Sequence, residues 1–225
     1  MLSSNRGAQA ASHNDIIIIK TTIKNLRRLS MSVLVGKKAP LFEAMTVFAG
    51  EFKKIRLEDY RGQYVILFFY PLDFTFVCPT ELHAFQEKLD AFTRLGATVL
   101  ACSVDSHFTH KAWLETPKIK GGIEGIKYGL ISDIGGKIAK EYDVLNEDGI
   151  AYRGLFLIDK EGTVRHQVVN DLSLGRSVIE ALRMLEALQH CEQNGEVCPA
   201  DWNKNQEAIT TTQDSVGRYL SKKSA

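Results

Sequence analysis

Hydrophobic residues occur along this chain both in continuous runs and at helical spacing, as in a protein that mixes buried strands with helices. Two runs, 64–70 and 97–104, are continuously apolar and rich in β-branched and aromatic residues, which is typical of strands buried on both faces. Between them, apolar residues recur at helical spacing from Pro79 to about Leu95, and Gly96 supplies a stop signal. Strand, helix and strand in this order predict a right-handed parallel crossover and therefore an α/β sheet.

Shorter segments extend this pattern on both sides. Two hairpins are predicted where apolar runs flank turn residues, at 42–48 with 52–55 and at 155–158 with 164–169. Short helices are also predicted at 57–60, 107–115 and 137–142, and a short strand is predicted at 128–132. Ser177-Val178-Ile179-Glu180 has capping-box spacing at the head of a longer helix, which Asn194-Gly195 ends.

Length and composition favour one α/β domain with an extension at each end. The chain has 225 residues, 44% hydrophobic and 24% charged, which is ordinary for a globular protein. Its formal net charge of +1 gives no reason to expect nucleic acid or a membrane surface as a partner. Residues 1–30 differ, because they carry five basic residues and one acid. They are interpreted as a disordered leader, a targeting segment or the result of a start codon placed too far upstream.

Four cysteines, Cys78, Cys102, Cys191 and Cys198, are too few and too scattered for a secreted disulfide framework. No C-x-x-C pair is present, so neither a structural metal site nor a dithiol reductase is expected, and no cofactor is predicted. This cysteine usage favours a reducing compartment. We therefore expect a cytoplasmic protein, with a mitochondrial location as the alternative if residues 1–30 are a transit peptide.

Candidate chemistry gathers in the stretch 71–81, between the first buried strand and the helix that follows it. Pro79 suits the start of a helix, so Cys78 is predicted to lie at or beside the helix N-cap. Unpartnered N–H groups and the helix macrodipole favour negative charge at that end, which biases a thiol there toward thiolate. The alternative is that Cys78 is a small buried hydrophobe.

Three separated motifs resemble the peroxiredoxins, in particular the typical two-cysteine subclass. Pro71, Thr75 and Cys78 stand in the arrangement P-x-x-x-T-x-x-C, the segment 152–159 resembles the strand with an active-site arginine, and 195–202 resembles a resolving-cysteine segment. The resemblance implies a thioredoxin-like α/β fold with a central mixed sheet flanked by helices. It also implies a peroxidase domain at 31–190 and a C-terminal arm at 191–225.

The resemblance implies a thiol-dependent peroxidase for hydrogen peroxide and organic hydroperoxides, with antioxidant function. Cys78 would be the peroxidatic thiolate that becomes a sulfenic acid. Arg153 would stabilise that thiolate and polarise the peroxide, Thr75 would orient the peroxide oxygen, and Pro71 would shield the sulfur from water. From the residues alone, the favoured alternative is that Arg153 is a solvated arginine near a strand end.

The resemblance also assigns Cys198 as the resolving thiol, which would form a disulfide with Cys78 of a second subunit. This implies an obligate homodimer, commonly assembled as a decamer of five dimers, and rereduction by a thioredoxin-like protein or a flavoprotein disulfide reductase. Cys102 is predicted to be a core residue, and Cys191 lies at the end of a helix as a possible secondary oxidation site. Residues 121–124 and 219–220 depart from the segments typical of easily over-oxidised members, so sensitivity to over-oxidation stays open.

Two rival functions come from other classes. A thiol hydrolase or transferase needs a histidine base within reach of its sulfur. His83 lies about 140° around the helix from Cys78, at about 100° per residue, so it points away from that sulfur. His107, His110 and His166 are left as candidates that only the fold can bring close. The second rival is a non-enzymatic holdase that protects unfolding proteins.

Overall fold

The computed structural model describes residues 33–223, so the predictions made for residues 1–30 lie outside the described residues. The described residues from Leu34 onward form one compact unit, which contains the sheet and its helices. Its strands are β1 (Glu43–Phe48), β2 (Glu51–Arg56), β3 (Tyr64–Phe69), β4 (Ala97–Ser103), β5 (Gly129–Ser132), β6 (Arg153–Ile158) and β7 (Val164–Asn170). Its helices are η1 (Leu57–Tyr60), α2 (Cys78–Glu87), α3 (Leu89–Arg94), α4 (His107–Leu114), η2 (Lys118–Lys120), α5 (Lys137–Glu141), α6 (Val178–Asn194) and α7 (Gln213–Lys223).

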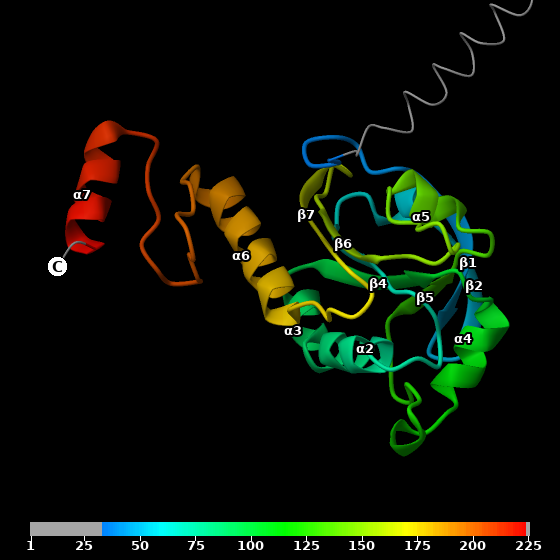
Figure 1. The fold of residues 1–225 in the computed structure, drawn as a ribbon. Coiled ribbons are helices and arrows are strands. Elements are labelled where there is room, and N and C mark those ends of the chain that lie inside the picture. Colours follow the sequence, from blue (N-terminus) through cyan, green and yellow to red (C-terminus); the bar gives the residue numbers. More distant parts are fainter. Residues whose placement is uncertain (1–32, 224–225) are drawn as a thin grey trace, which may run out of the picture. The chain divides into compact units, whose positions relative to one another are not determined.

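One mixed sheet of seven strands runs through this unit in the order β2-β1-β5-β4-β3-β6-β7 (Figure 1). β4 pairs in parallel with β3 and with β5, which confirms the predicted crossover, and the remaining pairs are antiparallel. Both predicted hairpins are present, as β1 with β2 and as β6 with β7. The expected α/β fold with a central mixed sheet is therefore confirmed.

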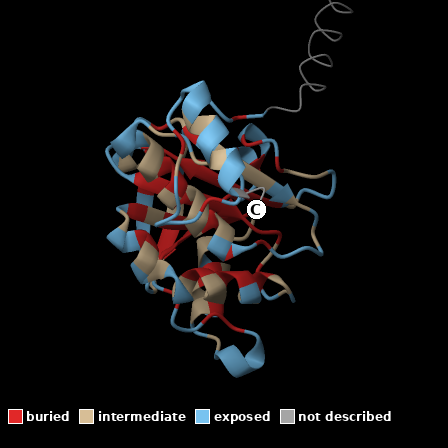
Figure 2. Ribbon diagram, turned by 90° about the vertical axis from the view of Figure 1, so that its left-hand side faces the viewer, coloured by how far each residue is buried: buried red, intermediate tan, exposed pale blue. Residues whose placement is uncertain are grey.

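Strand β3 is the centre of the core, because all six of its residues are buried. Its side chains alternate between two apolar clusters, one on each face of the sheet. Ile66 and Phe68 pack with residues of α2, α3 and α6, whereas Val65, Leu67 and Phe69 pack with residues of η1 and α5. Figure 2 shows this buried sheet between more exposed helices. Burying each of these side chains stabilises the fold by about 1.5–3 kcal/mol.

The helix predicted from Pro79 to Leu95 is in fact two helices, and the single-helix prediction is wrong in this respect. α2 ends at Glu87 and α3 begins at Leu89, because Lys88 between them has the non-helical angles φ −102° and ψ 2°. Neither glycine nor proline marks the break. Phe85 and Phe92, on opposite sides of it, are both fully buried with ring centroids 6.1 Å apart, so packing against the sheet sets this geometry rather than a local breaker.

The long helix α6 has the predicted ends. Ser177 is its N-cap, and the Ser177 side chain accepts a hydrogen bond from the backbone N–H of Glu180. Gly195 ends the helix in the left-handed conformation, with φ 66°, and its N–H donates to the carbonyl of Cys191. Beyond it, Val197 and Ile209 form an isolated bridge before α7. Within the part of the chain that the structure describes, no helix is both long and apolar enough to cross a bilayer.

Candidate active site

Cys78 is the first residue of α2, as the sequence predicts. The chain leaves β3 at Phe69, passes through a loop that contains Pro71 and Thr75, and enters the helix with Val77 as the N-cap. The Cys78 side chain is fully buried. Its sulfur therefore lies at the end of a helix where unpartnered N–H groups favour a negative charge, and where little water competes for that charge.

Arg153 lies beside this sulfur. β6 runs antiparallel to β3 with Phe68 opposite Leu155, so the first residue of β6 lies at the end of the sheet from which α2 begins. The Arg153 Nη1 donates to Cys78 Sγ at 3.4 Å, and Nε donates to the carbonyl of Leu172 at 2.7 Å. Arg153 is only 3% exposed, so the alternative of a solvated arginine is wrong.

Glu81 joins this arginine to a second one. Its Oε2 accepts from Arg153 Nη1 at 2.7 Å, and its Oε1 accepts from Arg176 Nε at 2.7 Å and from the Arg176 backbone N–H at 2.8 Å. Arg176 Nη1 also donates to the carbonyls of Phe69 and Gly154 at 2.8 Å and 2.6 Å. The carboxylate thus fixes both guanidinium groups between the start of α2 and the sheet.

Without a negative charge on the Cys78 sulfur, this cluster carries a net positive charge. Glu81, Arg153 and Arg176 are all buried, and the pair of guanidinium groups exceeds the single carboxylate by one positive charge. Burial raises the pKa of the Glu81 carboxyl, but hydrogen bonds and the charge of Arg176, with help from Arg153, outweigh burial and leave this pKa below its usual value. A thiolate at Cys78 would neutralise the remaining charge, whereas a neutral thiol would leave a buried cation uncompensated.

A buried cluster of polar side chains anchors the loop before α2. Asp73 accepts from Tyr70 Oη at 2.7 Å and from His110 Nδ1 at 2.7 Å, and the other ring nitrogen of His110 lies 3.1 Å from the carbonyl oxygen of Ile131. Both carboxyl and imidazole side chains are fully buried. Burial raises the pKa of Asp73, and its bonds to His110 and Tyr70 act against this rise.

Pro71 and Thr75, the other predicted site residues, flank this anchor. Pro71 is buried and directly follows the Tyr70 that binds Asp73, while Thr75 is half-buried. The Thr75 hydroxyl donates to the carbonyl of Leu72 at 2.8 Å, which fixes the turn that leads to the helix. The buried polar cluster around Asp73 and the hydrogen bond of Thr75 together fix the loop from Tyr70 to Thr75.

No histidine within residues 33–223 is placed to act as a base for the thiol. His83 Nε2 lies 3.1 Å from the carbonyl oxygen of Gly122, as its position around the helix predicts, and His110 is paired with Asp73. His107 lies on α4 with its ring edge-on to that of Phe52, and His166 lies on β7 opposite Leu157. The side chain of Cys78 instead accepts its hydrogen bond from Arg153. This geometry contradicts the hydrolase hypothesis, which requires a Cys–His contact.

The other cysteines lie in two different settings, and all four are free thiols. Cys102 is fully buried in β4, where burial raises the pKa of its thiol, so the prediction of a core residue is confirmed. Cys198 is half-buried on the arm beside α6, and its sulfur lies 3.6 Å from that of Cys191. Among the described residues, no group of three His, Cys, Asp or Glu side chains is arranged to hold a metal ion.

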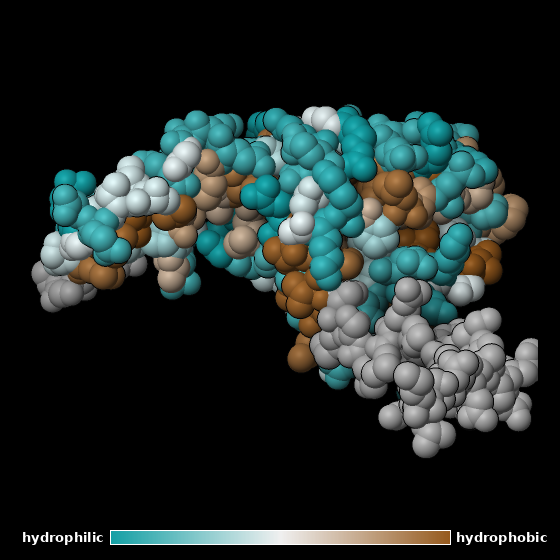
Figure 3. Space-filling view, turned by 90° about the horizontal axis from the view of Figure 1, so that it is seen from above, coloured by the Kyte–Doolittle hydropathy of each residue, from teal (hydrophilic) through white to brown (hydrophobic). Residues whose placement is uncertain are grey.

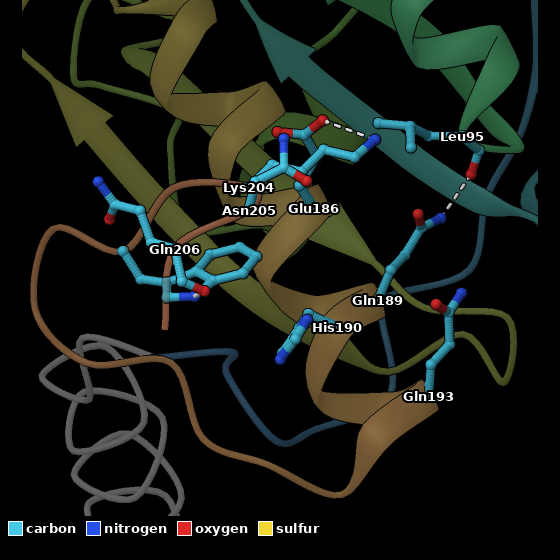
Figure 4. A pocket seen from close by; sticks show the side chains of 9 residues that line it. Leu95, Glu186, Gln189, His190, Gln193, Lys204, Asn205 and Gln206 are labelled. Atoms are coloured by element: carbon cyan, nitrogen blue, oxygen red, sulfur yellow. Dashed lines mark hydrogen bonds and ion pairs between the residues drawn. The ribbon is translucent and has the colours of Figure 1, made fainter. Parts of the chain in front are cut away.

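A separate hollow of about 450 Å³ lies between α6 and the arm (Figure 4). It is lined by Leu95, Glu186, Gln189, His190, Gln193, Trp202, Lys204, Asn205 and Gln206. None of the predicted site residues belongs to this lining, so the hollow is distinct from the Cys78 cluster.

Two residues of the cluster escaped sequence reasoning. Glu81 occurs in the helical pattern of α2, where a carboxylate in the first turn is typical of ordinary dipole complementation. Arg176 lies just before the cap residue Ser177, in a segment without periodicity. A buried charge leaves no local pattern, and only the pairing of β3 with β6 and the approach of α6 bring these side chains together.

Known protein families, sequences and structures resemble this chain over most of its length. The profile of the AhpC/TSA family matches residues 35–167, and the profile of the C-terminal domain of 1-Cys peroxiredoxin matches residues 187–222. The chain is 51% identical over 189 residues to Peroxiredoxin-2 of Mus musculus, covering 84% of this chain and 96% of that protein. It is 50% identical over 195 residues to Peroxiredoxin-1 of Gallus gallus, covering 86% and 98%. The reduced 2-Cys peroxiredoxin of Plasmodium vivax superposes with a TM-score of 0.82 at 48% identity, covering 84% of this chain and 100% of that one.

Proposed function

The chain belongs to the AhpC/TSA family of peroxiredoxins and is a thiol-dependent peroxidase, and from this premise we propose that Cys78 is the thiol that attacks the peroxide. The observation that carries the proposal is the hydrogen bond of 3.4 Å from Arg153 Nη1 to Cys78 Sγ at the start of α2. It is supported by the excess positive charge that Glu81 leaves in the buried cluster.

In the proposed reaction, the Cys78 thiolate attacks the distal oxygen of a hydroperoxide. An S–O bond forms, the O–O bond breaks, and the leaving oxygen takes up a proton and departs as water or an alcohol. Arg153 stabilises the thiolate and the charge that develops on the peroxide oxygens. Thr75 orients the peroxide, and Pro71 keeps water from the sulfur. The product on the enzyme is a sulfenic acid at Cys78.

Cys198 is the proposed resolving thiol. Its sulfur attacks the sulfenic acid of Cys78 in a second subunit, which forms a disulfide and releases water. The position of Cys198 on an arm beyond the end of α6 supports this role, because the arm is not part of the sheet of its own subunit. The disulfide is then reduced by a dithiol protein, which we propose to be a thioredoxin-like protein or a flavoprotein disulfide reductase.

A homodimer is the assembly that we propose for this exchange, with a decamer of five dimers as its further form. β7 is an edge strand of the sheet, and it carries the exposed Val169. Leu174 and Ile179 are exposed nearby in sequence, as is Val197 on the arm. Exposed apolar side chains beside an open strand edge are what a second copy would cover. On the face drawn in Figure 3, hydrophobic residues gather in separate patches within a largely hydrophilic surface.

The proposed division of the chain follows from this chemistry. Residues 31–190 would form the peroxidase domain and 191–225 the arm, although α6 runs without interruption across that boundary. Four free thiols suit a reducing compartment, and we propose a cytoplasmic location. A fluorescent protein fused behind residues 1–30 tests the mitochondrial alternative, because only a transit peptide would carry it into mitochondria.

Rapid-mixing kinetics of the reduced protein with hydrogen peroxide and with an alkyl hydroperoxide test the proposed function. We expect peroxide consumption by the wild type, formation of a sulfenic acid at Cys78, and neither of these in Cys78→Ser. Cys102→Ala is the matched control, since it removes a cysteine outside the site. Undiminished peroxide consumption by Cys78→Ser would contradict the assignment of this residue.

A further inference from the structure

Cys191 and Cys198 are neighbours in space as well as in sequence. They are seven positions apart, and the Cys191 thiol donates to Cys198 Sγ at 3.6 Å. The Cys198 thiol in turn donates to the carbonyl of Ala187 at 3.6 Å. Both side chains are half-buried, at the last turn of α6 and on the segment that folds back along it. The proposed resolving thiol therefore has a second thiol of its own chain as its immediate partner.

The arm is held against α6 by contacts on both sides of Cys198. Before it, Glu196 pairs with His190 at 2.8 Å. After it, the carbonyl of Trp202 accepts from Arg183 Nη1 at 2.7 Å, and its ring lies 4.9 Å from that of His190. Figure 4 shows one more such contact, between Lys204 on the arm and Glu186 on the helix. The closeness of the two sulfurs is thus built into the packing of the arm on α6.

We propose, on the basis of the function proposed above, that Cys191 is a third redox-active thiol, which takes over the disulfide from Cys78. In this step the Cys191 thiol gives its proton to water and attacks the Cys198 sulfur of the intersubunit disulfide. The new Cys191–Cys198 bond forms, the Cys78–Cys198 bond breaks, and Cys78 leaves as a thiolate. The peroxide remains the only oxidant, so two thiols of the arm end as one disulfide and Cys78 is reduced.

Three features of the site favour this direction. The attack occurs within one chain, over a contact already formed, so it needs no encounter with another molecule. The leaving group is the sulfur that Arg153 and the start of α2 stabilise as a thiolate, and a stabilised thiolate leaves faster. Burial, and then the hydrogen bond and nearby charge of Cys191, raises the pKa of Cys198, so Cys198 is a poorer leaving group than an ordinary thiol.

This transfer of the disulfide from Cys78 to Cys191, which we call the thiol relay, would change which disulfide the dithiol reductant reduces. Without it, the oxidised enzyme is a covalent dimer whose disulfide includes a sulfur at the buried start of α2. With it, the covalent link between subunits is transient, and the disulfide lies within a half-buried part of the arm. A dithiol reductant would then act on the arm while Cys78 is free to react with a second peroxide.

The test treats the reduced full-length protein with one equivalent of hydrogen peroxide per chain and blocks free thiols with N-ethylmaleimide at successive times. Non-reducing gels follow the covalent dimer. Mass spectrometry then measures the tryptic peptide 184–204, which contains both cysteines and lacks an internal cleavage site. A Cys191–Cys198 bond lowers the mass of this peptide by two hydrogen atoms and protects both sulfurs from the blocking reagent.

In the wild type we expect the dimer band to appear and then to be lost as the linked peptide accumulates. In Cys191→Ser the dimer band should persist until a dithiol is added, and in Cys102→Ala the wild-type course should be retained. Cys78→Ser should form no linked peptide.

A dimer that persists equally in the wild type and in Cys191→Ser, with no linked peptide, would overturn the relay while leaving the proposed function intact. Linked peptide in Cys78→Ser would also overturn it, because the pair would then be oxidised directly. A Cys191→Ser protein that forms no dimer and consumes no peroxide would instead contradict the proposed function.

Discussion

Arg153 and Cys78 are 75 positions apart in the sequence, yet Arg153 Nη1 donates to Cys78 Sγ at 3.4 Å. The same nitrogen also donates to Glu81 at 2.7 Å, and Glu81 shares its carboxylate with Arg176. The sulfur therefore belongs to a buried set of charges rather than to one ion pair. Its reactivity should depend on each member of that set.

Replacement of Arg153 by glutamine should slow the reaction of Cys78 with peroxide. A hydrogen bond to a charged group contributes about 1.5–3 kcal/mol, which corresponds to a rate about ten to a hundred times lower at about 1.36 kcal/mol per factor of ten. Stopped-flow kinetics with hydrogen peroxide measure this rate constant. Arg165→Gln is the control, since Arg165 is on the neighbouring strand with a side chain that is 45% exposed. Equal rates in Arg153→Gln and the control would remove Arg153 from the site.

Replacement of Glu81 by glutamine should change how stability depends on acid. The folded pKa of Glu81 lies below its usual value, so its contribution to stability is present above about pH 4.3 and is lost as the pH falls toward the folded pKa. The wild type should therefore lose more stability than Glu81→Gln over this acid range. Denaturant unfolding at a fixed protein concentration measures the difference.

At neutral pH the same substitution leaves two buried guanidinium groups without their carboxylate. We expect a loss of about 3–5 kcal/mol in the free energy of unfolding. Glu87→Gln is the matched control, because Glu87 is exposed on the same helix. If both variants unfolded at the same denaturant concentration, the carboxylate of Glu81 would not be holding the cluster together.

Replacement of Cys198 by serine should separate the two halves of the catalytic cycle. Cys78 should still consume one peroxide per chain, because its own surroundings are intact. Recycling by a dithiol reductant should be blocked, and no covalent dimer should appear on non-reducing gels. Single-turnover and steady-state assays on one preparation test this. Retained steady turnover would show that another thiol resolves the sulfenic acid.

Replacement of His110 by alanine should destabilise the loop that leads to the thiol. Asp73 would be left fully buried without its imidazole partner, and losing one member of a buried pair costs about 3–5 kcal/mol. Chemical denaturation gives this value directly. His107→Ala on the same helix, where the residue is half-buried, should cost within about 1 kcal/mol. A similar cost for both variants would mean that the Asp73–His110 pair does not anchor the loop.

The parts of the fold and of the site that could be predicted are those with a signal in neighbouring residues of the sequence. The continuous apolar run of β3 and the proline after Cys78 are local signals, so the buried strand and the helix start were both predictable. The break at Lys88 was not, because it depends on how Phe85 and Phe92 pack against the sheet. Arg176 has no local signal either, since its burial depends on a partner, Glu81, that is 95 positions away in the sequence.

The cysteines illustrate the same limit. A motif supplies the positions of Cys78 and Cys198, but the contact between Cys191 and Cys198 depends on the αL residue Gly195, which turns the chain back along α6. Sequence spacing alone places Cys191 only at the end of a helix.

The rate at which iodoacetamide alkylates Cys78 at neutral pH, followed by mass spectrometry of the peptide that contains this residue, tests the central claim most directly. The contact of Arg153 with the Cys78 sulfur, within the buried set formed with Glu81 and Arg176, predicts that Cys78 reacts faster in the wild type than in Arg153→Gln and faster than free cysteine. A Cys78 that reacts no faster than free cysteine, and equally fast in both proteins, would contradict the account.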